Sequence, residues 1–392
     1  MHYYIFSTKD TWLNEMTSSQ NYGGDEILEL SKNISSTGET YALNGVTRIL
    51  SKFNLTGTDS LEELVSKGLV PTVGTGSGQA KVYLRLYNTE ASELSTDYTL
   101  SAHPIGQDWE EGPGKFHQDP VVKEASSWEW ADYNTSTAWS ASNPSFTSGS
   151  PSNTQGGGIW TSGSNVFATG LFATQSFSYE SPDVNMDVTD ICRAWLNKDI
   201  SNYGFLLKFS GSQETDSSTS GNIKFFSKDT NTIYAPKLEV RWDDHSPISH
   251  SVTGSMTALD LTGEVDNILY VKRLRPRYKE GERVRFRVGG RKRYIDKTFT
   301  TSIHYASSSF VAEGSGSYSI IDQATGDVIV PFEVSGGTSY TQLSADSSSM
   351  YFTQYLDTFE PNRIYKILLK LKTNDGQEQI FDDDWEFAVV KK

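Results

Sequence analysis

Apolar and polar residues alternate over short runs along most of the chain, and such alternation is typical of strands that are buried on one side. In residues 81–87, Leu84 and Leu86 would point to one side of a sheet, whereas Arg85 and Tyr87 would point to the other. Similar runs occur at residues 27–30, 46–53, 98–104, 203–209, 223–227, 238–242 and 268–274. The pattern therefore predicts an all-β protein.

One segment breaks this alternation and predicts a short helix. In residues 188–196, Ile191 and Trp195 lie one helical turn apart, and Thr189 or Asp190 can accept hydrogen bonds from the first free N–H groups. Cys192 falls in the same segment. We expect it to be a buried thiol of the core and not a reactive one.

The last third of the chain predicts a second β-sandwich. Residues 283–288 place arginines on one side and Val284, Phe286 and Val288 on the other. Residues 359–365 resemble the corner that precedes a late strand of immunoglobulin-like domains, with Tyr365 as its tyrosine. Residues 365–371 and 385–390, with a turn at 374–376, would complete a hairpin.

Composition agrees with the predicted all-β class, and length indicates more than one domain. Its 392 residues suit two or three domains, and 12% aromatic residues with abundant Gly, Ser, Thr and Asn favour strands and turns. We expect a first β-sandwich over residues 1–244, a polar bridging segment over 245–270 and an immunoglobulin-like sandwich over 271–392.

Export and metal signals are missing from the sequence. The first ten residues have neither the basic end nor the apolar stretch of a secretory signal, and no window approaches ~20 apolar residues. The single cysteine cannot form an intrachain disulfide, and the six histidines lack zinc-ligand spacing. We expect folding in a reducing cytoplasm without a membrane segment, a metal centre or a cofactor.

Charge is distributed unevenly along the chain. The net charge of -15 argues against nucleic acid as the main partner, because phosphate binding needs a basic surface. Residues 272–297 nevertheless hold twelve Lys or Arg against three acidic residues, which gives +9 there and leaves -24 for the rest of the chain.

This basic stretch is the candidate partner-binding site. Planar guanidinium groups suit contacts with carboxylates, so we expect a docking surface for an acidic neighbour or for another copy of this chain. Its arginines are Arg273, Arg275, Arg277, Arg283, Arg285, Arg287, Arg291 and Arg293. Two alternatives stay open, a solvated strand edge that discourages aggregation and a contact with genomic DNA.

Five segments of the first half share the order and residues of one known module. They are residues 9–30 with Asn21-Tyr22-Gly23-Gly24, residues 48–55 (RILSKFNL), residues 108–132 with Trp109 and Trp128, residues 187–207, and residues 235–238. Together they resemble DNRLRE-type modules, which are grouped with carbohydrate-binding modules, although Ser51 and Asn54 depart from the usual residues. The resemblance implies an antiparallel jelly-roll sandwich.

The order of the two parts resembles structural proteins of large tailed phages, notably cyanophages. The second part contributes residues 278–300 and residues 380–387 (IFDDDWEF) to this resemblance. It implies a non-catalytic virion protein of the neck, tail or baseplate that contacts other virion proteins.

Other chemistry is less well supported by the sequence. Asp108, Glu110 and Glu111 could serve a glycosidase, but neighbouring strand residues point to opposite sides, so a polysaccharide-degrading tail enzyme is disfavoured. A structural calcium ion could bind residues 382–384 or the pair Asp187 and Asp190. The principal alternative is an adhesin that binds host glycans through exposed aromatic residues. Its candidates are Trp128, Trp130, Trp139 and Trp160.

Overall fold

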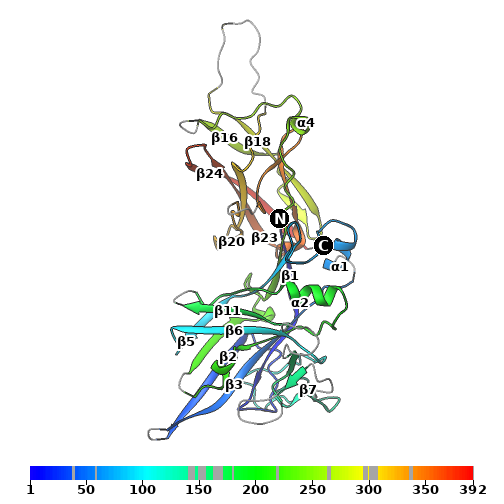
Figure 1. Cartoon of the computed structure of the whole chain (residues 1–392), viewed down its shortest axis with the longest axis vertical. Coiled ribbons are helices and arrows are strands. Elements are labelled where there is room, and N and C mark those ends of the chain that lie inside the picture. Colours follow the sequence, from blue (N-terminus) through cyan, green and yellow to red (C-terminus); the bar gives the residue numbers. More distant parts are fainter. Residues whose placement is uncertain are drawn as a thin grey trace. The chain divides into compact units, whose positions relative to one another are not determined.

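The protein is nearly all β, with 46% of residues in strands and 8% in helices, which confirms the predicted class. The computed structural model describes residues 1–392 except 38–39, 58–59, 140–145, 149–155, 162–170, 179–180, 218–219, 263–265, 295–298, 300–307, 335–338 and 392. The chain forms two compact units, Ile5–Val240 and a discontinuous unit of Met1–Tyr4 with Arg241–Lys392 (Figure 1).

The first unit is built on antiparallel strands that follow the order β11-β6-β13-β3-β1-β15-β4-β12, with β2, β14 and β5 attached to this path. Strand β3 pairs with β2 over its first part and with β1 and β13 over its second part. The strands are β1 (His2–Asn14), β2 (Ile27–Thr37), β3 (Thr40–Phe53), β4 (Lys81–Leu86), β5 (Asn88–Ser92), β6 (Asp97–Pro104), β7 (Trp130–Asp132), β8 (Thr137–Ala138), β9 (Phe146–Ser148), β10 (Ile159–Thr161), β11 (Ala173–Ser178), β12 (Val184–Asp187), β13 (Phe205–Phe209), β14 (Gly221–Phe226) and β15 (Lys237–Arg241).

Short helices connect some of these strands. They are α1 (Leu61–Ser66), α2 (Thr189–Leu196), α3 (Ser212–Thr215) and the 3-10 turn η1 (Lys228–Thr230). Helix α2 confirms the helix predicted at residues 188–196, and Cys192 is fully buried in it. The predicted cap is wrong, because Thr189 is the first helical residue and donates its N–H to Asp187 at 3.0 Å. The other helices were not predicted.

The second unit contains a four-stranded sheet in the order β16-β18-β22-β21 and a five-stranded sheet in the order β17-β24-β23-β19-β20. The strands are β16 (Asn267–Lys272), β17 (Arg277–Lys279), β18 (Arg283–Lys292), β19 (Gly316–Asp322), β20 (Val328–Val330), β21 (Ser344–Ala345), β22 (Met350–Tyr355), β23 (Arg363–Lys372) and β24 (Glu378–Val390), with helical turns α4 (His250–Thr253) and η2 (Leu356–Thr358).

Aromatic side chains from both sheets share one core. Tyr318 of β19 stacks on Phe352 of β22 with 3.9 Å between ring centroids, and Phe286 of β18 lies 5.3 Å from Phe387 of β24. Leu259 and Leu261 belong to the same core, although the sequence placed them in a bridging segment. Residues 245–270 are therefore part of the second unit.

The first four residues of the chain complete this second unit. Tyr3 packs edge-on against Tyr355 with 5.7 Å between ring centroids, and Gln354 Nε2 donates to the carbonyl of His2 at 2.9 Å. Tyr4 donates its hydroxyl to the carbonyl of Ile329. Because Met1–Tyr4 group with Arg241–Lys392, the sequence-based boundaries of 1–244 and 271–392 miss this contribution.

The predicted tyrosine corner is present at the start of β23. The Tyr365 hydroxyl donates to the carbonyl of Glu360 at 2.9 Å, and burial raises the pKa of this tyrosine well above its ordinary value. Such a bond fixes the loop before the strand.

We expect Tyr365→Phe to lower the free energy of unfolding by about 1–1.5 kcal/mol, because one buried hydrogen bond is lost. Urea denaturation followed by near-ultraviolet circular dichroism measures this loss. Tyr294→Phe is the control, since Tyr294 is 71% exposed. Equal effects of the two substitutions would contradict a stabilising corner.

Candidate functional site

Strand β18 carries four arginines of the basic stretch, Arg283, Arg285, Arg287 and Arg291. Arg283, Arg285 and Arg287 alternate with Val284, Phe286 and Val288, of which Phe286 and Val288 are buried in the core. The sequence-based prediction of an arginine side and an apolar side is therefore confirmed. The strand lies inside its sheet, paired with β16 and β22, so its arginines do not belong to an edge strand that discourages aggregation.

Tyrosines of the neighbouring strands lie beside these arginines. Arg285 lies 4.3 Å from the Tyr351 ring centroid, and Arg287 pairs in register with Tyr351 and with Lys272. Tyr270 covers Gly289, where a Cβ atom would lie 2.4 Å from the tyrosine Cζ. We call this surface the Arg–Tyr face. It comprises Tyr270, Lys272, Arg283, Arg285, Arg287, Arg291 and Tyr351.

One carboxylate neutralises part of the Arg–Tyr face. Arg287 donates to Asp346, and Arg285 Nη1 lies 4.0 Å from the same group. Burial alone would raise the pKa of Asp346, but hydrogen bonds from Ser348, Arg287 and Ser349 hold it below its ordinary value. Among the described residues, the five cations of the face and the Asp346 carboxylate give a formal charge of +4.

Four of the predicted arginines lie outside strand β18. Arg277 belongs to β17, an edge strand of the other sheet, and Arg275 donates to Glu282 at 2.6 Å. Arg273 occupies a turn with φ of 52°, and Arg293 follows the end of β18. Residues 295–297 of the stretch lie outside the described residues.

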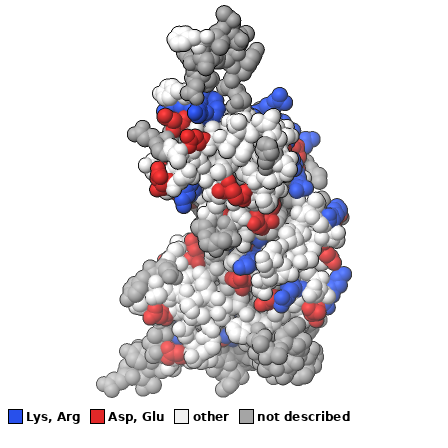
Figure 2. Space-filling view, turned by 45° about the horizontal axis from the view of Figure 1, so that its top comes forward, with Lys and Arg blue, Asp and Glu red and all other residues white. Residues whose placement is uncertain are grey.

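Acidic groups accompany the basic ones on the visible surface. Figure 2 shows Lys and Arg side chains interspersed with Asp and Glu on the face that it draws. Arg275 pairs with Glu282 and Arg287 pairs with Asp346, and these ion pairs compensate part of the formal +9 charge of residues 272–297. The Arg–Tyr face is a mixed aromatic and cationic surface, in which Arg285 lies over Tyr351 and Arg287 pairs with Asp346.

Three of the four candidate glycan-binding tryptophans are buried, so they cannot stack on a sugar. Trp128, Trp139 and Trp160 are 1%, 7% and 8% exposed and belong to one apolar cluster. Trp130 is half-buried in β7. This corrects the expectation of an exposed aromatic platform, because tryptophans in a sandwich preferentially fill the core.

Two of these tryptophans enclose a buried ion-pair network. The Arg48 guanidinium lies 5.0 Å from the Trp128 ring centroid and 4.6 Å from that of Trp160. Arg48 Nε donates to Glu214 Oε1 at 2.8 Å, and Lys208 Nζ donates to Glu214 Oε2 at 2.6 Å. We call Arg48, Lys208 and Glu214 the buried triad, and its role is structural since all three side chains are excluded from solvent.

Two segments of the proposed DNRLRE resemblance pack against each other. Asn21 is fully buried, and its Nδ2 donates to the carbonyls of Glu111 and Ser126, both at 2.7 Å. Its Oδ1 accepts from the N–H of Gly114 at 2.8 Å. A Cβ atom on Gly23 would lie 2.0 Å from the Glu111 carbonyl oxygen, so only glycine allows this approach.

The carboxylates first considered for glycosidase chemistry have separate lysine partners. Asp108 lies 3.0 Å from Lys52, and Glu110 lies 2.9 Å from Lys9. Glu111 lies 3.3 Å from Lys228 and also accepts the N–H of Asp10 at 2.7 Å. Each of these groups has a structural contact that accounts for its position.

The expected calcium ligands are likewise held by basic side chains. Asp382 and Asp384 both lie 2.8 Å from Lys366, and Asp190 lies 2.8 Å from Arg193. Asp187 accepts the Thr189 hydroxyl at 2.5 Å. Neither predicted location contains a described buried carboxylate oxygen that lacks a hydrogen-bond partner.

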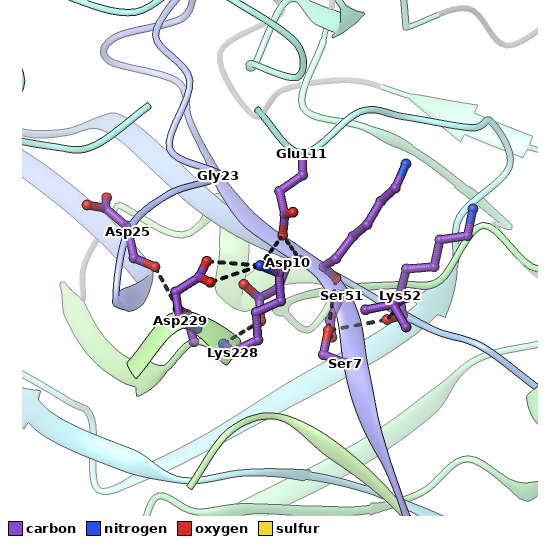
Figure 3. Close-up of polar contacts among 12 residues, drawn as sticks. Ser7, Asp10, Gly23, Asp25, Ser51, Lys52, Glu111, Lys228 and Asp229 are labelled. Atoms are coloured by element: carbon purple, nitrogen blue, oxygen red, sulfur yellow. Dashed lines mark hydrogen bonds and ion pairs between the residues drawn. The ribbon is translucent and has the colours of Figure 1, made fainter. Parts of the chain in front are cut away.

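A different acidic cluster was missed by sequence reasoning. Asp10 of β1, Glu111 and Asp229 of η1 place carboxylate oxygens within 4.8 Å of one another (Figure 3). Lys228 Nζ lies 3.3 Å from Glu111 and 3.0 Å from Asp229. The members are too far apart in the sequence for any motif to have joined them.

Two further properties concern membrane spanning and the cysteine. Among the described residues, no helix is both long and apolar enough to cross a membrane.

Complete burial raises the pKa of Cys192 far above its ordinary value, so its thiol stays protonated at neutral pH. The prediction of an unreactive core thiol agrees with this burial.

Comparisons with known proteins give no functional assignment. No protein family and no curated protein matches the chain. A solved structure of an FMN-binding beta-glucuronidase from Facaelibacterium prausnitzii aligns over 97% of this chain and 39% of its own length, at 10% identity and a TM-score of 0.15. That likeness is too weak to carry an argument, and the resemblance to DNRLRE modules stays a prediction.

Proposed function

We propose that this chain is a non-catalytic structural protein of a phage virion, located in the neck, tail or baseplate. In this proposal it joins neighbouring virion proteins through the Arg–Tyr face. The observation that carries the docking role is the stacking of Arg285 on Tyr351 at 4.3 Å, on a strand fixed from both sides.

The composition of the Arg–Tyr face supports a protein partner. Arginine and tyrosine are enriched among the residues that contribute most to interface affinity. Because Arg285 is already positioned by Tyr351 and Arg287 by Asp346, little side-chain entropy is lost on binding.

The partner in this proposal presents carboxylates. A net charge of +4 on the Arg–Tyr face favours an acidic surface, and further copies of this chain qualify, since the chain outside residues 272–297 carries -24. A glycan-binding adhesin is the weaker candidate, because Trp128, Trp139 and Trp160 are buried.

The test is cryo-EM and mass spectrometry of purified phage particles that encode the chain, with Arg285→Glu/Arg287→Glu as the variant. We expect wild-type density with the Arg–Tyr face against an acidic neighbour, and at least about tenfold less of the variant chain per particle, since close charge reversal costs several kcal/mol. Lys198→Glu is the control, because Lys198 is 77% exposed.

Two outcomes would overturn the proposal in different ways. Absence of the chain from particles removes the virion role. Presence of the chain with its Arg–Tyr face in solvent, and normal incorporation of the double variant, removes the docking role only.

A further inference from the structure

The acidic cluster of the first unit contains a carboxylate oxygen that lacks a partner. Asp10 is 1% exposed, and its Oδ2 accepts the N–H of Lys228 at 2.8 Å. Its Oδ1 is buried and has no hydrogen-bond partner among the described residues. A buried carboxylate oxygen without a hydrogen-bond donor is costly when ionised, and either a proton or a cation can compensate it.

The side chains around Asp10 leave excess negative charge. Asp10, Glu111 and Asp229 supply three carboxylates, whereas Lys228 supplies the one ammonium in contact with the last two. Burial, the strongest influence, raises the pKa of Asp10 to about 7, and it also raises the pKa of Glu111. The cluster is therefore unfavourable in its fully ionised form without a further cation.

The position of the cluster suits a hydrated divalent ion. Figure 3 shows the Asp10, Glu111 and Asp229 side chains pointing toward one another, with Lys228 between them. Asp229 is 41% exposed, so water can complete a shell of ~6–8 oxygen ligands, and Lys228 is 22% exposed and can turn toward solvent. Calcium tolerates such an irregular set of ligands better than magnesium does.

We propose that Asp10, Glu111 and Asp229 bind one calcium ion, with the buried Asp10 Oδ1 as the central ligand. The ion would tie three distant segments together, namely β1, the Glu111 segment that Asn21 holds, and η1. Its role is to stabilise the first unit, independently of the proposed virion function.

The test uses the full chain, freed of divalent ions with a chelator and dialysed. Isothermal titration with CaCl₂ should give a single site, and the thermal midpoint of the first unit should rise saturably with CaCl₂. An equal rise with NaCl at matched ionic strength would indicate charge screening and overturn the proposal. So would the absence of both the binding heat and the midpoint shift, which is the result expected if Asp10 is simply protonated.

Variants assign the site. Asp10→Asn and Asp229→Asn should each weaken calcium binding at least about tenfold, and Asp229 is exposed enough for its variant to fold. Lys228→Met should strengthen binding, because it removes the competing ammonium. The matched control is Asp190→Asn, since Asp190 lies on the surface beside Arg193. Unchanged affinity in Asp229→Asn and Lys228→Met would place the ion elsewhere and overturn the assignment.

Discussion

Glu214→Gln is expected to lower the free energy of unfolding of the first unit by about 3–5 kcal/mol, because it removes the buried carboxylate that both Arg48 and Lys208 contact. Arg48 and Lys208 contact separate oxygens of Glu214 at 2.8 and 2.6 Å, and neither can reach solvent. Urea denaturation of the full chain, followed by tryptophan fluorescence, measures the loss. Two of the nine tryptophans, Trp128 and Trp160, lie against Arg48 and contribute to this signal.

The same triad sets an acid limit on stability. Burial alone would raise the pKa of Glu214, but Arg48 and Lys208 hold it below its ordinary value of 4.5. A carboxylate with a lowered native pKa stabilises the fold above its unfolded pKa, and this contribution is lost as the pH falls through the native pKa. Wild-type stability should therefore fall below about pH 4.5, and Glu214→Gln should lack this component.

Glu90→Gln is the control for both measurements, since Glu90 is 61% exposed beside Lys224. Exposed pairs contribute about 0–1 kcal/mol. Two results would show that the buried triad is not a coupled network. One is a loss of unfolding free energy in Glu214→Gln within this small range, and the other is the same fall in stability at acid pH in Glu214→Gln as in the wild type.

Gly23→Ala should destabilise the first unit by more than about 3 kcal/mol, because overpacking against rigid backbone exceeds the usual cost of an added methyl group. The new Cβ would lie 2.0 Å from the carbonyl oxygen of Glu111 and 2.4 Å from that of Gly112. The segment cannot withdraw without breaking the bonds that Asn21 makes to Glu111 and Gly114. Differential scanning calorimetry of the full chain measures the shift.

The control separates a steric clash from backbone strain. Gly68 has φ of 67° and open space around its Cα, so Gly68→Ala should cost only about 1–2 kcal/mol. If Gly23→Ala proves as mild as Gly68→Ala, the close packing of residues 21–24 on the Glu111 segment is not required for stability.

Much of the fold was predictable because exposed and buried positions alternate within single strands. Predicted runs coincide with β4, β6 and β18 to within a few residues, and the Tyr365 corner and the α2 helix were also found. Strand β1 was missed, since its buried polar residues Asp10 and Thr11 interrupt the apolar pattern. Their burial depends on partners such as Lys228, which periodicity cannot reveal.

The candidate sites were predictable only where one strand carries them. The alternation in β18 predicted which arginines share one side of the strand. It could not predict that Arg277 belongs to a different sheet, because composition does not specify the turn between the two strands. The partner Asp346 lies 59 residues from Arg287. Asp10 and Lys228 are 218 residues apart and meet only because the sheet topology brings their segments together.

Tryptophan content was the least reliable guide. The sequence offered Trp128, Trp139 and Trp160 as sugar-binding residues, yet all three fill the apolar cluster around Arg48. An indole ring satisfies either role, and the deciding factor is whether neighbouring strands cover it.

The discontinuous second unit has a consequence for synthesis on the ribosome. Residues 1–4 emerge before the first unit, but their partners Trp242, Ile329 and Gln354 emerge only after the whole first unit has been made. Ile5–Val240 can fold during translation, whereas the second unit can form only after the strands that follow Val240 have been made. The closing step of the second unit then joins residues 352 positions apart, as in the bond between Gln354 and His2, and contacts of such high sequence separation form slowly.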